Sequence, residues 1–381
     1  MSAPKNSPLV DYALKGLERC WLPELGRWSH IYHLDNRDSP NESVPESDVF
    51  YTLNVLLGLA HVRHVPQHID ILETLRRTAA LLVTLPVSKY ALGAALWTAG
   101  ELEVDLPGRV LQHIENTLLN RDDWWDFRAQ DLGMILVGVT TQARHDRKRW
   151  SKLAAELFAF LVNRYSSASG LFFDAAHGPR RRFASFATQT YLTLACYAYG
   201  ELTNDVRAIN LANTCTKHLI ARQGPNGEWP WFFDAVSGSV LDFYEIYSVH
   251  QYGMAPAFLE RAECHGVTEA RAAMVKGFNW VFGKNQLAIP MLVPDLNLTI
   301  RSQVRKGELH SKGRRAFRAI TNSILGHKAE LINPAGVQLR LECRSYELGW
   351  ILWSFGQRSD LPELTYHEMF SSALKNDLIA E

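Results

Sequence analysis

The sequence predicts an all-α fold in which paired helices close into a double ring. Three observations lead to this prediction. Apolar residues recur three and four positions apart through about twelve long segments, the spacing of one helix face. The connections between these segments alternate between short and long. Two loops about 60 residues apart share nearly the same turn sequence, which indicates an internal repeat.

Several helix boundaries have local physical reasons. Asp48, after Ser47, offers an N-cap, and Asp205 offers another. Pro66 is tolerated in a first helical turn, and Gly266 ends a helix. Pro256 predicts a kink or break inside its segment because it has no N–H to donate. The expected helices run over 8–21, 48–63, 67–83, 88–102, 106–119, 128–143, 146–165, 183–202, 205–221, 244–264, 267–283 and 342–356.

The connection lengths indicate how the helices pair. Short links form antiparallel helix hairpins, and six hairpins close into an (α/α)6 toroid, with one helix of each pair inside and one outside. The long loops then gather on one rim. The short links are 101–107, 141–146, 201–205 and 264–268, and the long ones are 26–46, 120–127, 166–182 and 223–243.

The repeated turn supports this arrangement. Residues 170–178 read GLFFDAAHG and residues 229–238 read WPWFFDAVSG, and each precedes a helix rich in tyrosine. We interpret the two turns as equivalent loops of successive hairpins.

One stretch departs from the pattern. Residues 284–341 carry Pro290, Pro294 and Pro334, and we expect no long helix there. The segment 335–341 favours a strand, so we expect a long irregular or small β insertion between the last two helices of a single domain spanning 1–381. The basic residues at 301–318 either form a solvated face or bind an acidic group.

Composition limits the possible functions. The 47% apolar content excludes a disordered chain. The 40 basic and 40 acidic residues give no net charge, so we expect neither nucleic acid nor anionic membrane as a partner. The five cysteines are scattered, no apolar leader is present and no stretch of about 18 apolar residues occurs. We therefore expect a cytoplasmic protein without a membrane span; the pattern indicates no oligomeric state.

Cofactor motifs are missing from the sequence. It has no phosphate-binding glycine loop, no dinucleotide fingerprint and no serine nucleophile elbow. His30 with His33 and His61 with His64 lack a third ligand, so we expect no metal and no cofactor.

The helices that follow the long loops begin with polar residues and continue with small ones such as Gly58, Gly93, Gly138 and Gly349. If these are the inner helices, their amino ends converge on one funnel whose partial positive charge favours anions. The alternative is that helix starts simply prefer polar residues. The polar residues of the first two turns are Asp48, Tyr51, Asn54, Lys89, Tyr90, Arg128, Gln130, Asp131, Ser185, Thr188, Gln189, Glu245, Tyr247, His250, Gln251, Glu342, Arg344, Tyr346 and Glu347.

Two kinds of chemistry fit these residues. Two carboxylates across a cavity serve glycoside hydrolysis as acid and base, although a single carboxylate is usually a cap or an ion-pair partner. The hydrolytic candidates are Asp48, Asp131, Glu245 and Glu342.

A second set suits lyases and epimerases of uronic acids. Tyr247 and His250, three apart on one expected helical face, would move a proton with Tyr346, and Arg344 would hold the sugar carboxylate. The remaining substrate-binding candidates are the polar residues Tyr51, Gln189 and Gln251 and the stacking platforms Trp125, Trp229 and Trp231.

The alternating hairpins, aromatic rim loops and Phe-Phe-Asp turns resemble the six-hairpin (α/α) toroid superfamily of glycosidases, polysaccharide lyases and sugar epimerases. The resemblance implies a carbohydrate-active enzyme whose partner is a sugar or oligosaccharide. Residues 223–229 (QGPNGEW) are also similar to the repeat of terpene cyclases, so a terpenoid cyclase or isomerase is the alternative enzyme. A non-catalytic binding scaffold is the third interpretation, and it predicts a filled centre and an exposed apolar patch.

Overall fold

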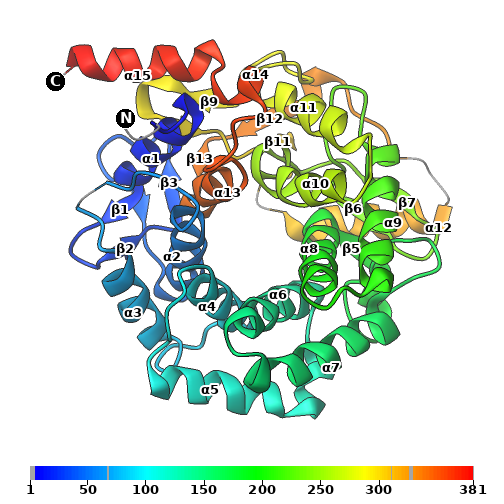
Figure 1. The fold of residues 1–381 in the computed structure, drawn as a ribbon. Coiled ribbons are helices and arrows are strands. Elements are labelled where there is room, and N and C mark those ends of the chain that lie inside the picture. The colour runs from blue at the N-terminus through cyan, green and yellow to red at the C-terminus, as the bar shows by residue number, and fades with distance from the viewer. Residues whose placement is uncertain (1–4, 67, 310, 326–328, 381) are drawn as a thin grey trace.

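A computed structural model describes residues 5–66, 68–309, 311–325 and 329–380 and shows a closed double ring of helices, the expected (α/α)6 toroid (Figure 1). The inner ring consists of α2 (Pro45–Leu59), α4 (Lys89–Glu101), α6 (Ala129–His145), α8 (Phe186–Thr203), α10 (Ala255–Cys264) and α13 (Ser345–Phe355). The outer ring consists of α1 (Pro8–Cys20), α3 (Ile71–Leu81), α5 (Gly108–Leu119), α7 (Arg147–Tyr165), α9 (Val206–Arg222) and α11 (Ala270–Val281).

The ring closes where the end of the chain meets its beginning. Helix α13 packs against both α2 and α1, so the sixth pair joins two distant parts of the sequence. The other inner helices each precede their outer partner, as the short links predict.

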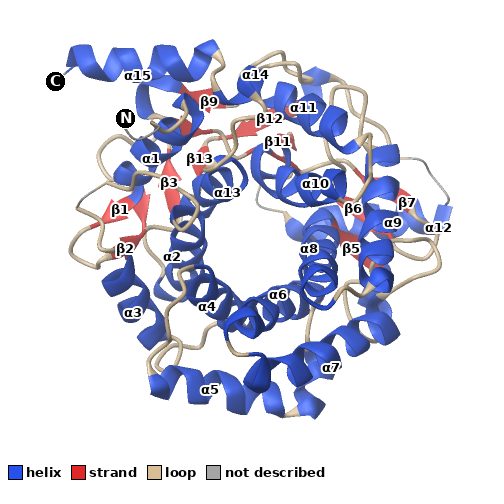
Figure 2. Cartoon of the chain, viewed as in Figure 1, coloured by secondary structure: helices blue, strands red, loops and turns tan. Residues whose placement is uncertain are grey.

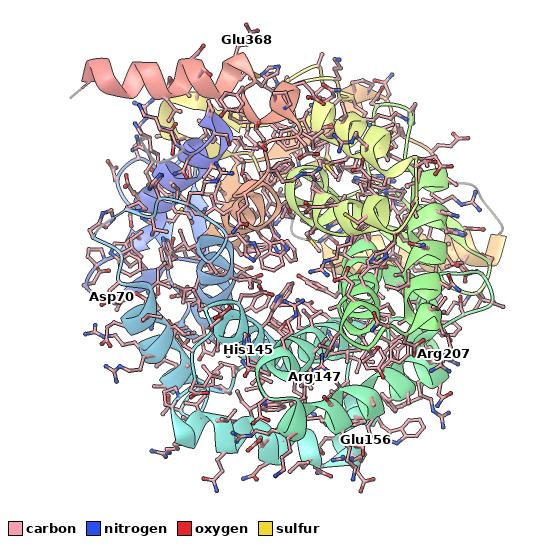
Figure 3. All side chains as sticks on the ribbon, viewed as in Figure 1. Asp70, His145, Arg147, Glu156, Arg207 and Glu368 are labelled. Carbon is pink, nitrogen blue, oxygen red and sulfur yellow. The ribbon has the colours of Figure 1, made fainter. Side chains whose placement is uncertain are left out.

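Burial separates the two rings. Outer helix α5 buries only Val110, Ile114 and Leu118, which recur every four residues along one face. Inner helix α6 is buried on nearly all sides from Ala129 to Ala143. Charged side chains such as Glu156 of α7 and Arg207 of α9 project outward from the outer ring (Figure 3).

Glycines allow the inner helices to approach closely. A Cβ on Gly93 would lie 2.4 Å from the backbone nitrogen of Ile135, and one on Gly138 would lie 2.4 Å from the carbonyl oxygen of Gly93. The same holds for Gly58, where a Cβ would lie 2.3 Å from the carbonyl oxygen of Gly349. The expectation that small residues let the inner helices crowd together is confirmed.

Short antiparallel strands lie beside the ring (Figure 2). They form five small sheets: β1 (Trp21–Leu22) with β2 (Arg27–Trp28); β13 (Glu342–Cys343), β3 (Ile31–His33) and β4 (Asn41–Glu42); β5 (Phe183–Ser185), β6 (Phe232–Asp234) and β7 (Ser239–Asp242); β12 (Val337–Arg340), β11 (Ser302–Arg305) and β8 (Ile246–Tyr247); and β9 (Leu292–Val293) with β10 (Leu298–Thr299). Two short 3-10 helices, η1 (Arg121–Asp126) and η2 (Pro179–Arg182), lie in the long loops.

The two Phe-Phe-Asp turns precede successive inner helices. Ala175, next to Asp174 of the first turn, pairs with Arg128 just before α6, and Phe233 of the second turn pairs with Ala184 just before α8. The turns therefore occupy equivalent places in the ring, as the repeat predicts.

The helix expected over 244–264 is wrong in its first part. Residues Ile246–Tyr247 form strand β8, and the chain then makes a π-helical turn, η3 (His250–Met254), before α10. Strand β8 pairs with β11, with Tyr247 opposite Ser302, and this pairing replaces helical hydrogen bonds. The break expected at Pro256 is confirmed, and it falls just before the proline.

The segment after α11 contains the expected short strands, in the antiparallel pairs β9 with β10 and β11 with β12, and also a helix, α12 (Lys312–Leu325). The expectation of no long helix over 284–341 is therefore wrong. Apolar residues such as Phe317 and Ile320 do recur at helical spacing, but both are exposed, and the prolines and basic residues of the segment outweighed this signal in the prediction. Two more helices, α14 (Pro362–Thr365) and α15 (Glu368–Ala380), follow the last expected one, and α15 packs on α1 outside the ring (Figure 1).

No helix in the described ranges is long and apolar enough to cross a membrane. All five cysteines are free thiols.

The glycine contacts give a stability prediction. Gly93→Ala places a methyl group against the backbone of α6, and overpacking of this kind costs about 1–3 kcal/mol. We expect a lower midpoint of urea unfolding. Gly108→Ala is the control because nothing lies within 4 Å of its Cβ, and it should be neutral or stabilising. Equal midpoints for the two variants would contradict the close packing of α4 and α6.

Candidate functional site

A cavity of about 290 Å³ lies where the first turns of the inner helices meet. Every inner helix, or the residues directly before it, contributes to its wall. The lining residues are Phe50, Tyr51, Tyr90, Gln130, Ser185, Ala187, Tyr191, Trp231, Tyr247, His250, Met254, Arg301 and Tyr346. The convergence of amino-terminal turns expected from the sequence therefore exists.

The structure separates the sequence-derived candidates into two groups. Tyr51, Trp231, Tyr247, His250 and Tyr346 line the cavity. The remaining candidates stand behind the wall or away from it: Asp48, Asp131, Glu245, Glu342, Gln189, Gln251, Arg344, Trp125 and Trp229. Among the described residues, no carboxylate belongs to the lining.

Two of the carboxylates fasten helix starts. Asp48 accepts the backbone N–H of Val44, directly before α2, at 3.2 Å, and also accepts hydrogen bonds from Arg27 Nε at 3.1 Å and Ser43 Oγ at 2.5 Å. Asp131 accepts backbone N–H bonds from Tyr90 and Arg128, both at 2.9 Å, and burial raises the pKa of its carboxyl group. These contacts are those of capping groups, the alternative that the sequence left open.

Glu245 is fully buried and is a member of an ion-pair cluster. Its carboxylate lies 2.6 Å from Arg315 Nη1 of α12 and 2.8 Å from Arg340 Nε of β12, and it also accepts a hydrogen bond from Ser302. The hydroxyl of Tyr247 donates to the same carboxylate at 3.1 Å. Glu245 therefore stands behind the cavity wall, in contact with Tyr247, and its partner Arg315 lies over the ring of the lining residue Trp231, 5.3 Å from the ring centre.

Two candidates, Trp229 and Gln189, have structural contacts instead. Trp229 is fully buried against Phe186, so its ring offers no free face for stacking, whereas Trp231 lines the cavity. Gln189 is bonded through both amide atoms to the backbone of Phe172.

Three further candidates outside the cavity lining are Gln251, Trp125 and Arg344. Gln251 is fully buried and donates to the carbonyl of Tyr247. Trp125 lies in η1 beside the first turn of α6. Arg344 reaches the cavity wall only through Tyr51, whose hydroxyl accepts a hydrogen bond from it at 3.0 Å.

Tyr247 and His250 form a contacting pair on the wall, with ring centroids 5.1 Å apart. They come from β8 and the π-helical turn, not from one helical face as expected. Burial and then the charge of Arg301 lower the pKa of His250 to about 3, so its imidazole is neutral at pH 7, and its Nδ1 has no hydrogen-bond partner. Burial and then Glu245 raise the pKa of Tyr247, so the phenol keeps its proton. One group is a free base and the other a proton donor.

Arg301 is the lining residue that sequence reasoning missed as a site. Its guanidinium carbon lies 5.0 Å from the centre of the Tyr247 ring. It pairs with Glu342 at 3.3 Å and with Glu347. Its only sequence signal is membership of the basic stretch 301–318, and its placement depends on the pairing of β11 with β8.

A buried charge network lies behind the cavity. It links four arginines to three glutamates, which leaves one more positive than negative charge when all are ionised. The members are Arg301, Arg315, Arg340, Arg344, Glu245, Glu342 and Glu347. The neighbouring pair of arginines, Arg305 and Arg318, is balanced by Asp242 and Glu308.

The positive excess grows in neutral solution. Burial raises the pKa of Glu347 to about 7, although Arg301 and Arg344 oppose the shift. Burial also opposes ionisation of Glu342, but Arg344, Arg301 and Arg340 outweigh it and lower the pKa of that carboxyl group. The network therefore favours an anion in the cavity.

No group of three or more metal-ligating side chains is arranged to hold an ion within the described ranges.

The pKa of Glu347 gives a pH prediction. The folded chain retains this proton up to about pH 7, whereas the unfolded chain loses it near its ordinary value of 4.5. The stability that this group contributes is thus lost as pH rises through that window. Relative to the wild type, the Tm of Glu347→Gln should rise by on the order of 2 °C or more between pH 5 and pH 8. The exposed Glu363→Gln is the control, and a constant Tm difference would contradict the assigned shift.

No family model matches the sequence, and no curated protein matches it by sequence comparison. Solved structures do match in fold. One is a possible member of the GH105 family from Salmonella enterica, with 11% identity, a TM-score of 0.60 and 92% coverage of each chain.

Two further structures match over similar lengths. Cellobiose 2-epimerase from Bacillus thermoamylovorans has 11% identity and a TM-score of 0.60, covering 92% of this chain and 99% of its own. An unsaturated glucuronyl hydrolase from Bacillus sp. GL1 has 10% identity and a TM-score of 0.58, covering 94% and 96%. These likenesses show that the chain shares its double-ring fold with these solved structures.

Proposed function

We propose that this chain is a carbohydrate-active enzyme that acts on a uronic acid unit of an oligosaccharide by proton transfer, as a lyase or an epimerase. The observation that carries the proposal is the buried excess of arginine behind a cavity lined by Tyr247, His250 and Arg301. The fold relatives, which include a cellobiose 2-epimerase and an unsaturated glucuronyl hydrolase, support a sugar substrate.

The charge network explains why the substrate should be anionic. A buried charge without a partner costs several kcal/mol. A sugar carboxylate beside Arg301 supplies the missing negative charge, and guanidinium and carboxylate match in a two-point hydrogen bond. The cavity is at the small end of the range for ligand sites, so one sugar unit rather than a chain fits inside.

The two wall residues then have distinct roles. His250 accepts the proton from the carbon next to the carboxylate, and Arg301 stabilises the negative charge that develops there. Tyr247 donates its proton to the leaving oxygen in an elimination, or to the opposite face of the carbon in an epimerisation. The bound carboxylate offsets the charge of Arg301 on His250 and so raises the pKa of the base.

The structure favours this chemistry over the other candidates. Hydrolysis by two carboxylates has no acid–base pair in the described cavity wall. A carbocation would be repelled by Arg301, which disfavours a terpenoid cyclase. The unfilled cavity disfavours a scaffold. We also propose a reducing compartment such as the cytoplasm, because all five thiols are free and four of them are buried.

Two substitutions test the roles directly. Tyr247→Phe and His250→Gln should each reduce kcat on uronate oligosaccharides by at least about a hundredfold, because each removes one proton-transfer group. Tyr366→Phe and His113→Gln, at exposed positions, are the matched controls and should retain full rate.

The assay also identifies the reaction. An elimination gives an unsaturated uronate that absorbs in the ultraviolet, whereas an epimerisation in heavy water incorporates deuterium without cleaving the chain. Turnover of neutral oligosaccharides alone, or full activity in both wall variants, would refute the proposal.

A further inference from the structure

We propose a second binding site, on the rim beside the cavity, that holds the remainder of an acidic oligosaccharide whose end unit lies inside. It consists of Trp125, Arg128, Arg164 and Arg181, here called the rim platform. The inference rests on the proposed function and extends it from one sugar unit to a chain.

The rim platform is continuous with the cavity wall. Arg128 directly precedes α6, two residues before the lining residue Gln130. Arg181 lies in η2, four residues before the lining residue Ser185. The two loops are joined by a backbone hydrogen bond from the N–H of Ala129 to the carbonyl of Asp174, at 2.9 Å. A chain that leaves the cavity between α6 and α8 therefore meets the platform first.

The aromatic part of the platform, Trp125, is held in place by neighbouring side chains. Trp125 is 39% exposed, an unusual position for an indole. The guanidinium carbon of Arg164 lies 4.3 Å from its ring centre, and Phe160 supports the indole edge-on at 5.8 Å. Arg181 donates to the backbone carbonyl of Arg164 at 3.0 Å, and its guanidinium carbon lies 3.9 Å from the ring centre of Phe173. A fixed indole with an exposed part is a surface on which a pyranose ring stacks.

The arginines of the platform differ from their neighbours in charge balance. Arg180 and Arg182 pair with Asp174 at 3.1 Å and Asp234 at 2.5 Å. In contrast, Arg128, Arg164 and Arg181 form no salt bridge within the described part of the chain.

The same loop also exposes acidic groups. Asp122 and Asp126 of η1 are exposed beside Trp125 and will repel a polyanion. The sugar ring should therefore stack on the exposed part of the indole that Arg164 does not cover. A ligand that combines sugar rings with repeated carboxylates matches an exposed indole in contact with Arg164, with Arg128 and Arg181 in the adjoining segments.

The test compares ligand lengths. We would measure by calorimetry the binding of a uronate monosaccharide and of a six-unit uronate oligomer to the full chain. In the wild type, the six-unit oligomer should bind about tenfold more tightly than the monosaccharide, and added salt should reduce the difference. In Trp125→Ala and in Arg128→Gln with Arg164→Gln, the advantage should fall to about twofold or less, while monosaccharide binding is unchanged. Arg109→Gln, an exposed arginine of outer helix α5, is the control and should retain the full advantage.

The outcomes separate the two proposals. An unchanged length advantage in the platform variants overturns the rim platform and leaves the cavity proposal intact. Equal affinity for a single-stranded DNA oligomer of matched charge also overturns it, because a bare polyanion would then suffice. Failure of the uronate monosaccharide to bind the wild type refutes the proposed function itself, and the rim platform proposal with it.

Discussion

The cavity depends on a buried network of arginine and glutamate that joins segments far apart in the sequence. Glu245, just before β8, contacts Arg315 of α12 and Arg340 of β12, and Arg301 contacts Glu347 of inner helix α13. Removing one member of such a network leaves a partner buried and unpaired, which costs several kcal/mol. The segment between α11 and α13 is therefore fixed against the inner ring, and it supplies the only guanidinium among the described lining residues.

The ring geometry and this network have different structural roles. Glycine contacts such as that between Gly93 and the backbone of α6 bring the inner helices together along their length. The cavity lies at their amino ends, where aromatic and polar side chains take the place of backbone contact. Because the wall is buried, the environments of Tyr247 and His250 shift their pKa values in opposite directions. A buried pocket thus provides a base and an acid without a carboxylate in its wall.

The sequence predicted the fold well and the site in part, for physical reasons. Helical periodicity and alternating link lengths identify twelve helices of the double ring, because each must bury a face at fixed spacing. First-turn positions such as Tyr51 and Tyr346 were predictable for the same reason. Arg301 was not predictable as a site residue, because its position depends on strand pairing and not on a periodic sequence pattern. Trp229 and Trp231 are two residues apart in one loop, yet Trp229 is buried in the core and Trp231 lines the cavity. This difference depends on tertiary packing.

The most direct test of the account is a crystal structure of the chain with a bound uronate monosaccharide, compared with a soak of its neutral methyl ester. The account predicts the carboxylate within hydrogen-bond distance of the Arg301 guanidinium, with the adjacent carbon facing the imidazole of His250, and no density for the ester. A uronate whose carboxylate points away from Arg301, or an ester that occupies the cavity equally well, would contradict it.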